Sequence, residues 1–77
     1  MIKAVVYGAT GYTGRELLRI LSSHKEVKIE CAVSRRESKN LGELLPEFVK
    51  TPLEEIPVVS PDKVRNFDVA FLALPHG

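Results

Sequence analysis

Three glycines, Gly8, Gly11 and Gly14, recur at intervals of three in the stretch GATGYTG. An apolar run precedes them and a helical pattern follows, which is where dinucleotide-binding folds receive a pyrophosphate. Glycine allows a tight turn, lets backbone N–H groups approach phosphate oxygens and permits close packing of a helix on a strand. The spacing differs by one residue from the commoner G-x-G-x-x-G pattern. We interpret the stretch as a phosphate-binding turn; the alternative is a tight turn with a structural role only.

Polar and aromatic side chains lie between the glycines. Thr10 and Thr13 offer hydroxyl groups to the same phosphates, although either could equally be only a helix cap. Tyr12 could pack against the turn or contact the cofactor, and the sequence does not choose between the two. We include Thr10, Tyr12 and Thr13 with the glycines as candidate cofactor-binding residues.

Ser34, Arg35 and Arg36 follow a second apolar run, about twenty residues after the last glycine. Proteins that use NAD usually present an acid at this position to the ribose 2′-hydroxyl, whereas those that use NADP need cations for a 2′-phosphate. An arginine can bind a phosphate through two parallel hydrogen bonds. The sequence therefore predicts NADP as the cofactor; the alternative is an ordinary charged loop.

The first elements that position these residues are a strand and a helix. Residues 2–7 are an apolar run that predicts a strand buried on both faces. A helical pattern covers residues 15–23, and the capping-box spacing of Thr13 and Glu16 places its start there or one or two residues earlier. The expected apolar face of this helix is Leu17, Leu18, Ile20 and Leu21.

Further elements alternate along the rest of the chain. Residues 27–33 predict a second strand, whose Val27, Ile29, Cys31 and Val33 are expected on one face. The remaining segments predict, in order, a short helix over 41–49 interrupted near Pro46, an edge strand over 54–60, a helical turn over 62–66 and an apolar strand over 68–74.

This order of elements predicts an α/β fold with a Rossmann-like parallel sheet of about three or four strands and two helical segments. The expected strand order is 3-2-1-4, with both helical segments on one face of the sheet. Because a complete fold of this kind needs about six strands, residues 1–77 are interpreted as the N-terminal fragment of a dinucleotide-binding domain. We expect a bare second face, an open edge at the last strand and self-association.

Composition excludes several other classes of protein. The formal net charge is +1 with no basic block, so neither nucleic acid nor a membrane surface is an expected partner. No apolar segment approaches the length of a membrane span, and the single cysteine is typical of a reducing compartment. We expect a cytoplasmic protein without a metal site.

Three segments together carry a resemblance to a known family. GATGYTGRELLRILSSH, SRR and DVAFLALPHG resemble the N-terminal part of N-acetyl-gamma-glutamyl-phosphate reductase, in the semialdehyde dehydrogenase superfamily. The resemblance implies an oxidoreductase of arginine biosynthesis; the alternative is a relative that acts in lysine biosynthesis on a carrier-protein-bound substrate. It also implies NADPH, a small acyl-phosphate substrate reduced to a semialdehyde, and a homo-oligomer. In the family the similar last loop lines the cofactor cleft, which implies that role for Ala73, Leu74, Pro75 and His76; the alternative is a simple strand terminator.

The family's nucleophilic cysteine belongs to a later segment resembling N-P-G-C-Y, which this sequence does not contain. Cys31 lies within the second predicted strand, and we interpret it as a packed, inert thiol. No catalytic residue is assigned, and we expect the chain alone to be inactive. The alternatives are an atypical short-chain NADP reductase and a non-catalytic nucleotide-binding module.

Overall fold

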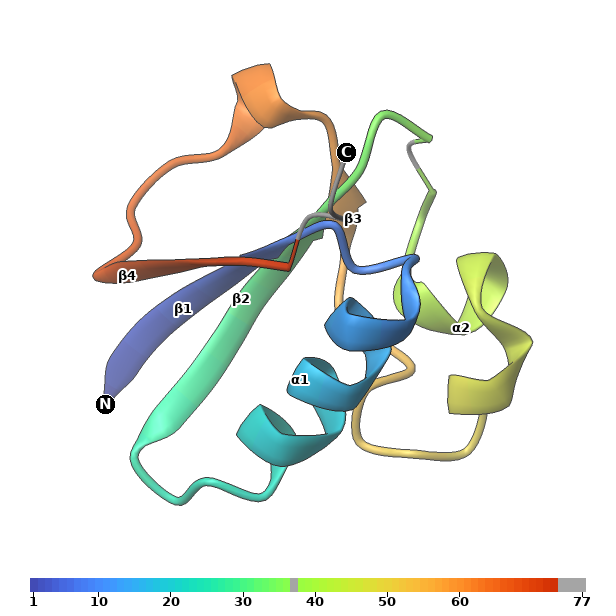
Figure 1. The fold of residues 1–77 in the computed structure, drawn as a ribbon, viewed down its shortest axis with the longest axis horizontal. Coiled ribbons are helices and arrows are strands. Elements are labelled where there is room, and N and C mark those ends of the chain that lie inside the picture. Colours follow the sequence, from blue (N-terminus) through green and yellow to red (C-terminus); the bar gives the residue numbers. More distant parts are fainter. Residues whose placement is uncertain (37, 74–77) are drawn as a thin grey trace.

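The computed structural model describes residues 1–36 and 38–73. Within them the chain forms a four-stranded sheet of order β3-β2-β1-β4 (Figure 1). Every neighbouring pair of strands is parallel. The elements are β1 (Ile2–Tyr7), α1 (Tyr12–Ser22), β2 (Val27–Val33), α2 (Leu41–Leu44), the 3₁₀ turn η1 (Pro46–Phe48), β3 (Val58–Val59), the 3₁₀ turn η2 (Pro61–Lys63) and β4 (Val69–Leu72).

The predicted fold class and strand order are confirmed. The central position of β1 explains its sequence, because Ala4, Val5 and Val6 are fully buried between β2 and β4. Both long strands have the predicted bounds. β3 and β4 are shorter than predicted but lie within the predicted segments, and residue 74 of the last predicted strand is outside the described residues.

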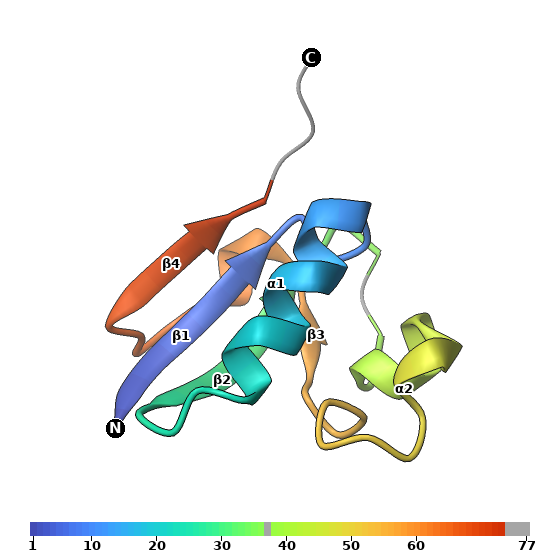
Figure 2. The same ribbon diagram turned by 60° about the horizontal axis from the view of Figure 1, so that its bottom comes forward.

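One face of the sheet carries both α1 and α2, as predicted (Figure 2). Leu18 and Leu21 of α1 share one hydrophobic cluster with Leu41 of α2 and Phe48 of η1. Ile20 does not belong to it and is 65% exposed, so its assignment to the apolar face was wrong. It lies two residues from Leu18, and two helical positions are about 200° apart.

A bulge in β2 changes the expected faces of this strand. Ala4 of β1 pairs with Ile29, but Val5 pairs with Cys31, so Glu30 is an extra residue in the ladder. Val27 and Ile29 therefore pack on the helical side, whereas Cys31 and Val33 belong to a second cluster on the other side. The prediction that Val27, Ile29, Cys31 and Val33 share one face was wrong, because strict alternation does not continue across a bulge.

The second face of the sheet is partly covered, not bare as expected. Val5, Cys31 and Val33 are buried there, and Val64 packs against them. Val64 belongs to the connection that runs from β3 at one edge of the sheet to β4 at the other. The helical turn in this connection is η2, which begins one residue before the predicted segment 62–66 and ends within it.

The helices differ at their first residues. α1 begins at Tyr12 with Gly11 as its N-cap and no side-chain cap, so the earlier of the two predicted starts is confirmed and Thr13 and Glu16 do not form a capping box. α2 is capped by Asn40, whose Oδ1 accepts a hydrogen bond from the Glu43 N–H at 2.9 Å. The interruption near Pro46 is confirmed, because η1 begins there. No helix in the described part of the chain has the length and apolar character needed to cross a membrane.

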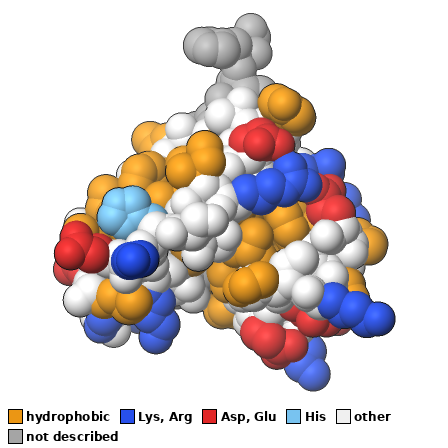
Figure 3. All heavy atoms as spheres, turned by 90° about the horizontal axis from the view of Figure 1, so that it is seen from below, with side chains coloured by type: hydrophobic (Ala, Val, Ile, Leu, Met, Phe, Trp, Pro, Cys, Tyr) orange, Lys and Arg blue, Asp and Glu red, His pale blue; other side chains and the backbone are white. Residues whose placement is uncertain are grey.

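Hydrophobic side chains also reach the surface at the end of the sheet where the strands begin (Figure 3). A groove of about 200 Å³ lies there, between the last turn of α1 and the start of β2. It is lined by Ser22, Val27, Lys28, Ile29, Pro52, Leu53 and Ile56. This groove is at the opposite end of the sheet from the glycine turn.

We predict that Gly14→Ala destabilises the fold. A Cβ at Gly14 would lie 2.2 Å from the Gly8 carbonyl oxygen and 2.7 Å from the Ala9 Cα, and both are backbone atoms. Overpacking of this kind costs about 1–3 kcal/mol, so the free energy of unfolding in urea should fall by about 2 kcal/mol. Gly11→Ala is the control, since its Cβ would meet only the Gly8 oxygen at 3.7 Å. Equal losses for the two variants would contradict this packing.

We predict that the Cys31 thiol reacts slowly in the folded chain. Burial, with the nearby Glu30 carboxylate, raises the pKa of Cys31, so less thiolate is present at a given pH. The rate of reaction with a disulfide reagent at pH 8 should be at least about tenfold lower in the native chain than in the chain unfolded in urea. Equal rates would show that the thiol is accessible and ionised.

Candidate nucleotide-binding site

The turn between β1 and α1 depends on two of its three glycines for backbone reasons. Gly8 has a φ of 76°, a backbone conformation that residues with a side chain rarely adopt. Its carbonyl accepts a hydrogen bond from the Gly11 N–H at 3.2 Å. Gly14 brings the first turn of α1 into direct contact with the backbone of residues 8 and 9. Together they hold the start of α1 against the end of β1.

Gly11 is different, because the fold does not require a glycine there. Its φ is −78°, and a Cβ would meet only one atom, at an ordinary contact distance of 3.7 Å. Gly11 is exposed and lines a pocket beside the turn. A backbone without a side chain at this point leaves room for a ligand to approach.

The first turn of α1 presents unused hydrogen-bond donors. The first helical bond runs from the Arg15 N–H to the Gly11 carbonyl at 3.0 Å. The N–H groups of residues 12–14 have no acceptor in the described part of the chain, and no acid lies in the first turn. Such a helix end attracts anions through its free donors and its partial positive charge. The hydroxyls of Thr10 and Thr13 likewise have no partner among residues 1–36 and 38–73.

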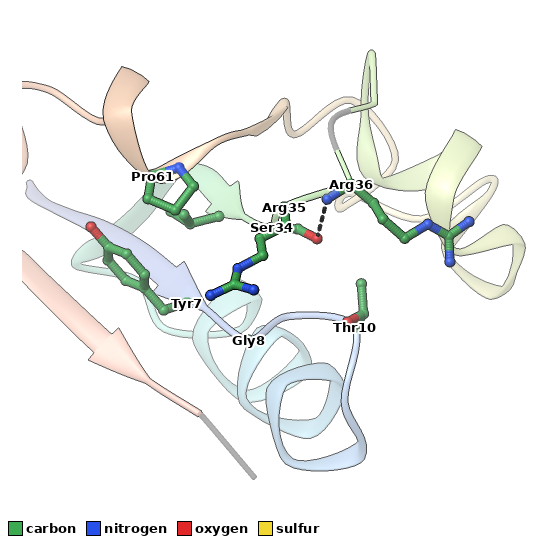
Figure 4. Close-up of a pocket in the computed structure, with 8 residues that line it drawn as sticks. Tyr7, Gly8, Thr10, Ser34, Arg35, Arg36 and Pro61 are labelled. Atoms are coloured by element: carbon green, nitrogen blue, oxygen red, sulfur yellow. Dashed lines mark hydrogen bonds between the residues drawn. The ribbon is translucent and has the colours of Figure 1, made fainter.

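A pocket of about 450 Å³ lies between the glycine turn and the end of β2. Figure 4 shows the Arg35 side chain extending over this pocket toward Gly8, whereas Arg36 extends away from it. The Ser34 hydroxyl accepts a hydrogen bond from the Arg36 N–H at 3.1 Å, which fixes the backbone of this loop. The lining residues are Tyr7, Gly8, Thr10, Val33, Ser34, Arg35, Arg36 and Pro61.

The electrostatics of this pocket favour an anion. Neither Arg35 nor Arg36 has an ion-pair partner among the described residues. By contrast, Arg15 and Arg19 of α1 both pair with Glu47, at 3.2 and 2.7 Å. No acid is present among the described residues that line the pocket. The two arginines at the end of β2 are therefore available to an external anion.

A second pocket, of about 310 Å³, lies on the β4 side of the same turn. Gly8 and Thr10 line both pockets, so both spaces adjoin the glycine turn. The other residues that line the second pocket are Gly11, Tyr12, Thr13 and Ala73. The predicted cofactor-binding residues Leu74 and Pro75 lie outside the described residues, as does His76.

The larger pocket thus brings Gly8 and Thr10 of the turn together with the predicted residues 34–36. The predicted residues 11–13 line the second pocket, and Gly14 lines neither. The sequence analysis missed three residues of the larger pocket, Tyr7, Val33 and Pro61. Tyr7 and Val33 are the last residues of β1 and β2, so their position at a strand end was a usable signal. No sequence signal indicated Pro61, because its position depends on the path of the connection from β3 to β4.

Comparison with known proteins gives one family. Residues 3–77 match the NAD-binding domain of semialdehyde dehydrogenase. The N-acetyl-gamma-glutamyl-phosphate reductase of Akkermansia muciniphila is 43% identical over 81 aligned positions, covering 99% of this chain and 23% of that protein. Those of Halothermothrix orenii and Aquifex aeolicus are 42% and 40% identical, covering 100% and 97% of this chain.

The chain spans 23% of the length of the first two relatives and 22% of the third. The likeness therefore concerns the part of those proteins that contains the glycine turn and the loop after β2. A family described as binding NAD agrees with a turn that has free N–H groups and a pocket on each side. On the family match over residues 3–77, this chain belongs to the NAD-binding domain family of semialdehyde dehydrogenases.

Proposed function

We propose that this chain is the NADPH-binding part of a reductase that acts on a small acyl phosphate, as the name N-acetyl-gamma-glutamyl-phosphate reductase describes for its relatives. The choice of NADP over NAD rests on one observation: Arg35 and Arg36 have no ion-pair partner among the described residues. An acid for a ribose 2′-hydroxyl is absent from the described lining of the pocket.

Each part of the site has a role in this proposal. The N–H groups of residues 12–14, with Thr10 and Thr13, bind the pyrophosphate. Arg35 binds the 2′-phosphate from above the larger pocket, with Ser34 beside it and Arg36 at the outer side. When bound, NADPH supplies a hydride for the reduction. The proposed cleft continues to Leu74 and Pro75, beyond the described residues.

The residues of this chain bind and orient but do not form the covalent intermediate. Cys31 is buried on the second face of the sheet, and its raised pKa leaves little thiolate. We propose that the nucleophilic cysteine belongs to a part of the enzyme outside residues 1–77. The chain is then the N-terminal fragment of a dinucleotide-binding domain and inactive alone. The complete enzyme is proposed to be a cytoplasmic homo-oligomer of arginine biosynthesis.

We predict that Arg35→Ala removes the preference for NADPH over NADH. Hydrogen bonds to charged groups contribute about 1.5–3 kcal/mol, so NADPH affinity should fall by about 10- to 100-fold while NADH affinity changes little. Arg36→Ala should have a smaller effect, because its side chain extends away from the pocket. Nicotinamide fluorescence at low salt measures both affinities.

Lys39→Ala is the matched control. Lys39 is an exposed cation of the same loop, but it does not line the pocket. The substitution should leave both affinities within about twofold of the native values, as expected for a screened surface charge. A native chain that binds NADH as tightly as NADPH, or an Arg35 variant that loses both equally, would contradict the proposal.

A further inference from the structure

The side chain of Tyr12 has no evident role in the fold. It is 80% exposed at the first position of α1 and belongs to neither hydrophobic cluster. Its hydroxyl has no hydrogen-bond partner in the described part of the chain. The other tyrosine, Tyr7, is half-buried and packs against the second cluster. A large aromatic side chain left in solvent at a pocket is typical of a binding residue.

The surroundings of Tyr12 are small and polar. It lines the pocket on the β4 side with Gly8, Thr10, Gly11, Thr13 and Ala73, and it is the one aromatic residue among the described lining residues. Next to it, Gly11 contributes no side chain, although the fold would accept one there. Free N–H groups and threonine hydroxyls lie at the same place. The pocket therefore offers an aromatic surface beside donors for a phosphate.

This chemistry fits a flat heteroaromatic ring attached to a phosphate. Arg35 and Arg36 line the other pocket, and the two pockets share Gly8 and Thr10 as lining residues. A dinucleotide with its pyrophosphate at the turn and its 2′-phosphorylated end at Arg35 would have its other end free to enter the pocket of Tyr12. The oxidised nicotinamide ring is a cation, which the face of a tyrosine attracts.

We infer that Tyr12 contacts the nicotinamide half of the cofactor and contributes to affinity for that half alone. The inference rests on the proposed function and deepens it, because it separates the two ends of one ligand. Tyr12 contacts the nicotinamide mononucleotide end, whereas Arg35 binds the 2′-phosphate end.

Two probes separate these contacts by calorimetric titration. NADP⁺ has both ends, whereas adenosine 2′,5′-bisphosphate lacks the nicotinamide end. Stacking of a base on an aromatic side chain contributes about 1–3 kcal/mol, so Tyr12→Ala should weaken NADP⁺ binding by about tenfold. It should leave binding of the bisphosphate within about twofold, and Tyr12→Phe should keep most of the affinity for NADP⁺.

Ile20→Ala is the control, because it shortens another exposed side chain of α1 that lies away from both pockets. It should change neither affinity, and urea unfolding should show the same midpoint for Tyr12→Ala as for the native chain. If the native chain binds both probes and Tyr12→Ala weakens neither, or weakens both equally, the inference is wrong and the proposed function stands. If the native chain binds neither probe, the proposed function fails as well.

Discussion

The structure depends on the contact of Gly14 with the backbone at the end of β1. No Cβ fits between α1 and the carbonyl of Gly8, so the first turn of the helix lies directly on the turn that leads into it. Leu18 and Leu21 follow Gly14 as the other buried residues of α1 and belong to the core. The contact of Gly14 also leaves the N–H groups of residues 12–14 at the carboxyl edge of the sheet, where they have no acceptor among the described residues. The packing of α1 and the free donors of its first turn thus share one cause.

The pairing register of β1 and β2 places the second half of the site, the loop after β2, beside the glycine turn. After the bulge at Glu30, Tyr7 pairs with Val33, so β1 and β2 end side by side. The next residues of the two strands are Gly8 and Ser34, and both line the larger pocket. Parallel strands place their carboxyl ends at one edge, which is why residues far apart in sequence meet there. Arg35 then extends over the larger pocket toward Gly8 of the glycine turn (Figure 4).

The sequence predicted β1 and β2 because apolar runs and glycines act locally. It predicted the strand order from the alternation of strands and helices along the chain. It did not predict the bulge, since one extra residue in β2 is defined only by its pairing with β1. It left the helix start open between Thr13 and a point one or two residues earlier. The earlier start is correct, because α1 begins at Tyr12 and Gly11 is its N-cap without a side-chain cap. The sequence predicted the glycines and arginines of the site but not the different directions of Arg35 and Arg36, which depend on a loop fixed by the Ser34 hydroxyl.

The most direct test of this account is an amide chemical-shift titration of the chain with NADP⁺. The central claim is that one nucleotide lies across the glycine turn, between the two pockets that share Gly8 and Thr10. The account predicts the largest shifts at residues 8–14 and 34–36, with little change at the groove formed by Val27, Leu53 and their neighbours. Shifts centred on that groove, or no shifts at a saturating concentration, would contradict it.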